Sequence, residues 1–179
     1  MWKPLVRSSI IGGIVVFLWM MISWTVLPFH EMMIKKVKNP TEVISCVSRN
    51  TPEDGIYTIP HMDDGDTVAS ANGDKSPFIF VNINRSVEFS AMTKPIIVGI
   101  ILQIIGAFLL TYLLLQAKAM KFWKKVRFIT IGGLTVALLG AVPSWNWWHY
   151  PGSWVFLECL DYVIGWFLGG LVIAKLSKK

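Results

Sequence analysis

The chain has 179 residues, of which 54% are hydrophobic and 16% are charged, and its net charge at pH 7 is +6. Soluble domains are usually about 45–50% apolar and about 25% charged, so this composition excludes an ordinary soluble domain. The apolar residues are concentrated in four blocks, which indicates an integral membrane protein. The two cysteines lie in different kinds of segment, and we therefore expect no structural disulfide.

The four apolar blocks predict four transmembrane helices. They cover residues 8–28, 96–116, 126–142 and 154–174. Each block is close to the ~20 residues that a helix needs to cross the hydrocarbon core of a bilayer. The first block is longer than the apolar part of a cleavable signal peptide, and no small-residue cleavage site follows it, so we interpret it as an uncleaved anchor. The predicted fold is an all-α membrane protein, a four-helix bundle with a small extracytoplasmic α+β cap between helices 1 and 2.

The distribution of charge predicts the orientation. Residues 1–7, 117–125 and 175–179 contain Lys or Arg but no Asp or Glu. The segment 29–95 has seven cations against nine carboxylates, and the link 143–153 has neither. Because basic loops stay in the cytoplasm, we expect both termini and the link 117–125 to be cytoplasmic. The cap and the link 143–153 are then expected outside.

The long polar segment contains signals of ordered structure. NPTEVISCVSRN (39–50) predicts a short helix with Asn39 as N-cap and Pro40 at the first helical position. IYTIP (56–60) and PFIFVNINR (77–85) are rich in β-branched and aromatic residues and predict two strands. The cap is therefore expected to combine one helix with a hairpin-like pair of strands.

The region between the two predicted strands, 63–74, is acidic. Its carboxylates could bind calcium, which prefers oxygen ligands. Their spacing does not match the calcium loop of an EF-hand, so a solvated loop is the favoured interpretation. The candidate ligands are Asp63, Asp64, Asp66 and Asp74.

Tryptophan gathers in the link SWNWWHYPGSW (144–154). Trp and Tyr collect at membrane interfaces, so this link is expected to anchor the ends of the third and fourth helices. The anchors are Trp145, Trp147, Trp148 and Trp154. An alternative interpretation is a lipid-binding lip of an enzyme, in which His149 acts as acid or base with His61 or His30, and with Glu158.

The fourth apolar block carries two carboxylates, Glu158 and Asp161. Counted from the outer ends of their helices, Asp161, Gln103 and Thr135 lie at the same depth, about 12 Å below the surface. An intramembrane carboxylate is costly, so we expect Asp161 to be protonated and to contact Gln103 or Thr135 inside the bundle. Glu158 is expected to reach toward the interface. The pair could serve either as a structural clip or as part of a proton or ion path.

Small residues recur on one face of several predicted helices. Such faces let helix backbones approach closely in membranes. The glycines expected at helix contacts are Gly99, Gly106, Gly133, Gly140, Gly165 and Gly169.

Several stretches together resemble a family of small bacterial four-span inner-membrane proteins to which no activity is assigned. They are GIYTIP (55–60), SPFIF (76–80), MTKPIIVGIILQIIGAFLLTYLL (92–114), WNWWHYP (145–151) and DYVIGWFLGGLVIAKL (161–176). The resemblance implies a bacterial inner membrane and a periplasmic cap. In layout alone, the chain is also similar to bacterial lipoprotein intramolecular transacylases, which place a β-containing domain between the first two of four spans.

These observations favour a multi-pass inner-membrane protein with a non-enzymatic accessory or envelope role. Two alternatives stay open, namely an enzyme acting on lipid or lipoprotein at the outer leaflet and a small proton-coupled carrier. The expected partners are membrane lipid and, in the accessory role, another membrane or envelope protein. Nucleic acid, metal and cofactor are not expected.

Overall fold

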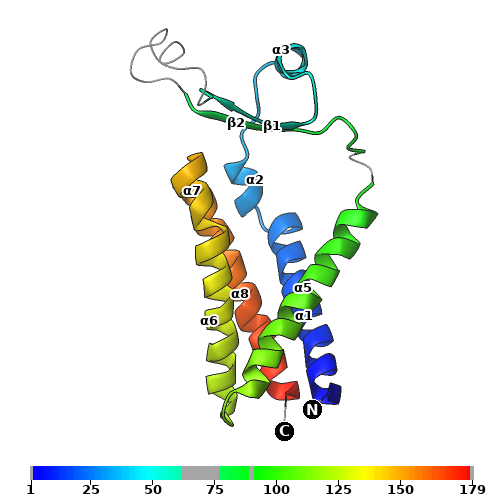
Figure 1. The fold of residues 1–179 in the computed structure, drawn as a ribbon, viewed down its shortest axis with the longest axis vertical. Coiled ribbons are helices and arrows are strands. Elements are labelled where there is room, and N and C mark those ends of the chain that lie inside the picture. Colours follow the sequence, from blue (N-terminus) through cyan, green and yellow to red (C-terminus); the bar gives the residue numbers. More distant parts are fainter. Residues whose placement is uncertain (1, 62–76, 89–90, 178–179) are drawn as a thin grey trace. The chain divides into compact units, whose positions relative to one another are not determined.

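The computed structural model describes residues 2–61, 77–88 and 91–177. The chain divides into two units. A helical unit comprises Met1–Ile34 and Ala91–Lys179, and a second unit comprises Lys35–Ser90. Figure 1 shows the elements of both units along the chain. The acidic stretch 63–74 lies outside the described residues.

The helical unit contains four helices that are long and apolar enough to cross a membrane, as the sequence predicted. Two short helices, α2 and α7, accompany them. The bounds are α1 Trp2–Thr25, α2 Phe29–Met33, α5 Thr93–Gln116, α6 Phe122–Gly140, α7 Val142–Trp148 and α8 Gly152–Leu176.

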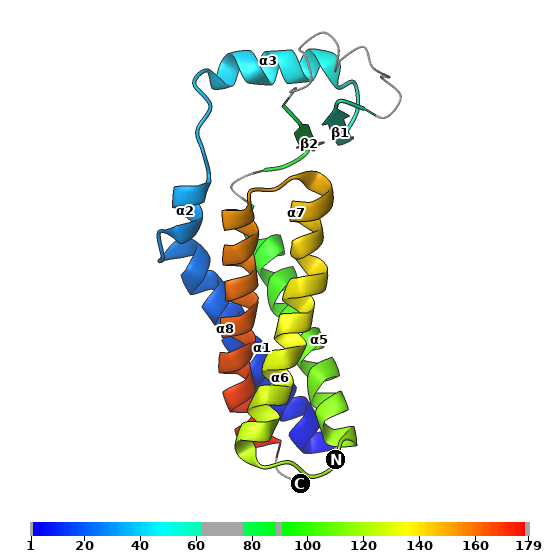
Figure 2. The ribbon, with the colours of Figure 1, turned by 90° about the vertical axis from the view of Figure 1, so that its left-hand side faces the viewer.

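The helices extend beyond the apolar blocks. Backbone hydrogen bonding continues through polar residues, whereas hydropathy marks only the part suited to hydrocarbon, so α1 begins at Trp2 and α6 at Phe122. Much of the Trp-rich link, expected as a loop, is helical: α7 continues the direction of α6 (Figure 2). Residues Phe29–Met33, expected in the cap, form α2 and belong to the helical unit.

The core of the helical unit lies between its four long helices. Helix α8 packs mainly on α6 and α1, and α5 packs mainly on α1. Figures 1 and 2 both show α6 running beside α8. A cluster of buried apolar side chains from all four helices fills the centre: Val16, Ala107, Leu114, Ile129, Trp166 and Ile173.

Glycines allow the close approach of these helices. A methyl group on Gly13 would lie 2.6 Å from the Cα of Ile104, so α1 meets the backbone of α5 there. On α8, a methyl group on Gly169 would lie 3.3 Å from the carbonyl oxygen of Gly12. Four further glycines expected at contacts also face neighbouring side chains, namely Gly99, Gly106, Gly133 and Gly165.

The expectation for Gly140 was wrong. A methyl group on this residue would have no neighbour within 4 Å among the described residues. Gly140 is the last residue of α6. The sequence spacing places a glycine on a helix face but does not say which part of that face a neighbouring helix covers.

The second unit contains α3 (Pro40–Asn50), β1 (Gly55–Ile59) and β2 (Ile79–Ile83). The side chain of Asn39 accepts a hydrogen bond from the backbone N–H of Glu42, which confirms the predicted N-cap. The strands pair antiparallel with Gly55 opposite Ile83. After β2, Arg85 forms a 3.0 Å ion pair with Asp54 and donates to Thr51, which ties the strands to the end of α3.

Candidate functional site

The candidate site is a buried polar cluster formed by Ser23, His30 and Asp161, here named the polar cluster. Asp161 is 4% exposed, His30 2% and Ser23 1%. The hydroxyl of Ser23 donates a 2.6 Å hydrogen bond to Oδ1 of Asp161. Nε2 of His30 lies 3.2 Å from Oδ2, an ion-pair distance. Both oxygens of the carboxylate therefore face a polar partner.

The end of α1 explains why His30 reaches this position. Helix α1 ends at Thr25, and Pro28 precedes α2, so the chain turns before His30. The amide of Leu27 bonds to the carbonyl of Ile22, which leaves the carbonyl of Ser23 without its usual helical donor. Nδ1 of His30 lies 3.3 Å from that oxygen and takes its place. Thus His30 provides a polar partner for the carbonyl of Ser23 near the end of α1.

These contacts constrain the protons of the cluster. The carbonyl of Ser23 can only accept, so Nδ1 of His30 carries a proton. Nε2 of His30 and Oδ2 of Asp161 lie at ion-pair distance, but neither buried atom makes a hydrogen bond within the described residues. The expected protonation of Asp161 stays a prediction.

Two tryptophans enclose the imidazole. The ring of Trp24 stacks on His30 with centroids 4.0 Å apart and an interplanar angle of 21°. Trp154 meets the same ring edge-on at 5.9 Å. Trp154, expected as an interface anchor, thus packs within the helical unit, whereas Trp145 and Trp147 are exposed.

A small cavity of about 70 Å³ adjoins the cluster. Its size fits a few water molecules rather than a substrate. Glu158 lies on the same face of α8 as Asp161, one turn away, and both line this cavity. The remaining lining residues are Met20, Trp24 and Tyr162.

The expected polar layer differs from the observed one. Asp161 is buried as expected, but its partners are Ser23 and His30 rather than Gln103 or Thr135. The hydroxyl of Thr135 donates to the carbonyl of Ile131 in its own helix, on an exposed position. Gln103 lies on α5, which packs mainly on α1. Equal depth along the helices does not tell which face a side chain occupies.

The residues weighed for catalysis lie in different places. His61 belongs to the second unit, whereas His149 and Glu158 belong to the helical unit. His149 ends α7 in the left-handed conformation, with a φ angle of 54°. The catalytic grouping of these three residues stays a prediction. Sequence reasoning weighed His30 only as a catalytic partner of His149, and it missed Ser23 and His30 as the partners of Asp161.

The polar cluster can join three elements, since it links α1 and α2 to α8. In the described residues, no group of three His, Cys, Asp or Glu side chains is placed to bind a metal ion. Comparison of the chain with known protein families, with curated proteins and with solved structures finds no match. The polar cluster must therefore be interpreted from its own geometry.

Proposed function

We propose that the chain is a multi-pass protein of a bacterial inner membrane with a non-enzymatic, accessory role in the envelope. In this role, the polar cluster fixes the point at which the chain leaves the membrane toward the unit Lys35–Ser90. The observation that carries the proposal is the buried contact between His30 and Asp161. His30 lies four residues before Ile34, where the chain passes from the helical unit to the unit Lys35–Ser90. The contact with Asp161 therefore attaches the chain to α8 shortly before it enters that unit.

The orientation in the proposal rests on charge. The N-terminal residues, the link 117–125 and residues 175–179 are basic and lack carboxylates. With these segments in the cytoplasm, Lys35–Ser90 faces the periplasm. The bacterial inner membrane rests on the resemblance described for the sequence. Together they describe a protein that presents a small α+β unit at the outer surface.

The geometry favours a structural role over an enzyme. In an acyl-transfer site, the histidine takes the proton of the nucleophilic hydroxyl. Here the hydroxyl of Ser23 donates to Asp161 instead, and His30 faces the same carboxylate. The three residues are at most 4% exposed, so a substrate would have to displace the aromatic rings that enclose the imidazole of His30.

A proton carrier is also less well supported. A carrier needs a hydrated path from Asp161 to the opposite end of the helices. Beyond Asp161, the described core is occupied by the apolar cluster that includes Val16, Ile129 and Trp166. The cavity of about 70 Å³ beside Asp161 is lined by residues of the same end of α1 and α8.

The attachment can be tested by spin labelling. In a chain with both cysteines replaced by serine, Glu31→Cys places a label on exposed α2, and Thr93→Cys places a matched label at the exposed start of α5. Adding Asp161→Leu should increase the mobility of the label at position 31 and leave that at position 93 unchanged. An unchanged spectrum at position 31 would refute the proposed role.

Reconstituted liposomes with an entrapped pH dye test the carrier. We expect proton uptake equal to that of protein-free liposomes. If proton uptake exceeds that level and Asp161→Asn abolishes the excess, the accessory role is refuted in favour of proton transport. The same preparation shows by protease protection whether Lys35–Ser90 lies on the side opposite residues 117–125.

A further inference from the structure

A groove runs along the first turns of α1, at the end of this helix that lies farthest from the polar cluster. Its volume is about 720 Å³, within the range of ligand pockets. The buried residues in the same part of α1 include Leu5, Ser9 and Gly12, which lie on the other side of the helix. The groove therefore occupies the side of α1 that does not pack on neighbouring helices. Its lining residues are Trp2, Lys3, Val6, Arg7, Ile10 and Ile11.

Two cations give this groove its charge. Lys3 and Arg7 are four residues apart on one helix, so their side chains are neighbours on its surface. Both residues are exposed. Neither forms a hydrogen bond or an ion pair with any residue that the structure describes. Their N–H donors and their two charges are therefore not balanced within the described part of the chain.

Acidic side chains that could balance these cations are missing from this end of the helices by sequence. The only Asp and Glu residues of the helical unit are Glu31, Glu158 and Asp161. Glu31 follows the far end of α1, and Asp161 contacts Ser23 near that same end. Glu158 lines the small cavity beside Asp161. The groove thus keeps its positive charge and suits a ligand that carries a negative group.

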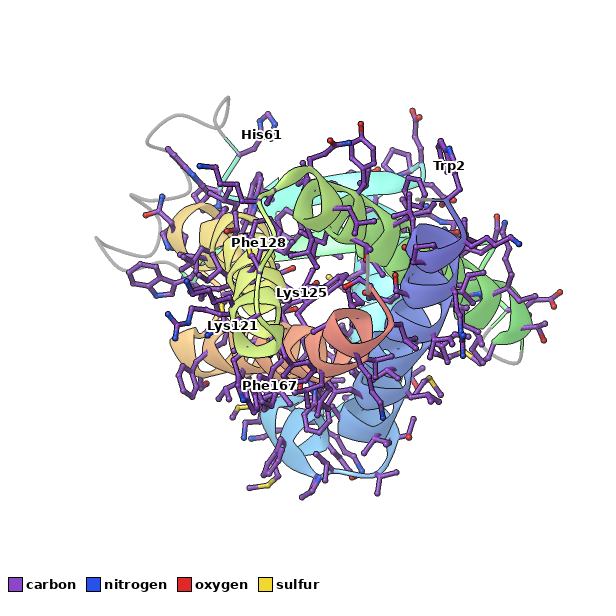
Figure 3. All side chains as sticks on the ribbon, turned by 90° about the horizontal axis from the view of Figure 1, so that it is seen from below. Trp2, His61, Lys121, Lys125, Phe128 and Phe167 are labelled. Atoms are coloured by element: carbon purple, nitrogen blue, oxygen red, sulfur yellow. The ribbon has the colours of Figure 1, made fainter. Side chains whose placement is uncertain are left out.

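The groove begins at the level expected for lipid headgroups and continues along an apolar surface. Trp2 is 65% exposed, and Figure 3, which looks along the helices from this end, shows it at the margin of the helical unit. Exposed tryptophans of membrane proteins collect at the headgroup level. Beyond Arg7, the exposed apolar residues Ile10, Ile14 and Leu18 follow on α1. From Arg7 to Leu18 the helix rises about 16 Å, which is about half of the ~30 Å hydrocarbon core and matches one leaflet.

We propose that this groove binds an anionic phospholipid, whose phosphate lies between Lys3 and Arg7 and whose acyl chain follows Ile10 toward Leu18. A guanidinium holds two phosphate oxygens at once, and the lysine adds a second cation beside it. Basic residues at the membrane surface attract anionic headgroups in this way. The inference requires that α1 crosses a membrane, and it is independent of the accessory role, of the orientation and of the polar cluster.

The full chain in detergent is titrated with lipid, and occupancy is measured by native mass spectrometry. Dioleoylphosphatidylglycerol should bind more tightly than dioleoylphosphatidylcholine, which has the same chains and no net charge. Lys3→Gln and Arg7→Gln should each weaken phosphatidylglycerol binding by about fivefold, the effect of one basic residue near an anionic headgroup. Lys124→Gln is the matched control, because Lys124 is an exposed lysine in the first turn of α6 that does not line the groove. It should change the binding by less than about twofold.

Each outcome decides the proposal. Equal binding of the two lipids would overturn it, because the charge would then play no part. An equal loss in Lys124→Gln would reject the groove in favour of diffuse surface charge. Displacement of the lipid by inorganic phosphate at similar concentration would identify a site for free anions instead. Lys3 lies in the first turn of α1, so Lys3→Gln reports on binding even where Arg7→Gln disturbs the fold.

Discussion

A double-mutant cycle tests whether the polar cluster is held together by its own partners. His30→Phe keeps an aromatic ring between the two tryptophans but removes both ring nitrogens. Asp161→Leu removes the carboxylate at similar volume. Each single change leaves a buried partner without its contact, and removal of one member of a buried charged pair costs about 3–5 kcal/mol in soluble proteins.

In a membrane the cost should be smaller. Hydrogen bonds between membrane helices average about 0.6 kcal/mol, and each change removes two polar contacts of the cluster. The orphaned partner adds about 1–3 kcal/mol, so we expect each single variant to lose about 2–4 kcal/mol. The double variant should lose less than His30→Phe, because an unpaired intramembrane carboxylate itself costs about 2.5–3.5 kcal/mol and is no longer present. It should also lose less than Asp161→Leu, because the buried imidazole that this change leaves without its partner is absent as well.

The assay is reversible unfolding in mixed detergent micelles, with the free energy compared across the cycle. A coupling of at least about 2 kcal/mol between positions 30 and 161 is expected. Thr130→Val is the matched control, since its hydroxyl donates to the carbonyl of Val126 within α6, a helix that contributes no residue to the polar cluster. Its effect should add to that of Asp161→Leu. Additive effects of His30→Phe and Asp161→Leu would refute the reasoning.

Three further predictions concern other parts of the chain. Gly13→Ala should lower the midpoint of thermal unfolding in detergent, because the added methyl group would meet the backbone of α5. Gly140→Ala should raise this midpoint slightly, since the space around Gly140 is open and alanine is more favourable in a helix than glycine by up to about 1 kcal/mol. A membrane-impermeant maleimide added to intact spheroplasts should label exposed Cys46 and spare half-buried Cys159; protection of Cys46 would contradict the proposed orientation. Arg85→Ala should speed proteolysis within Lys35–Ser90 by loosening the strands, although the exposed ion pair between Arg85 and Asp54 contributes at most about 1 kcal/mol. An unchanged cleavage rate would show that the contacts of Arg85 are not needed to hold the strands.

The helices and strands were largely readable from local pattern. Long apolar blocks predict the four long helices, because only about 20 apolar residues in a helix match the thickness of a bilayer. The N-cap at Asn39 and the strands β1 and β2 follow from local signals of a few residues. Helix ends were less accurate, because backbone hydrogen bonds do not stop where hydropathy falls.

The sequence by itself determined that Asp161 must be buried among polar partners, since a lone carboxylate in an apolar helix is too costly to face lipid. Only the tertiary structure decided which partners these are. Helix depth can be counted along the chain, but the rotation of each helix depends on how the helix faces pack on one another. That packing placed Ser23 and His30 against Asp161 and left Thr135 bonded within its own helix.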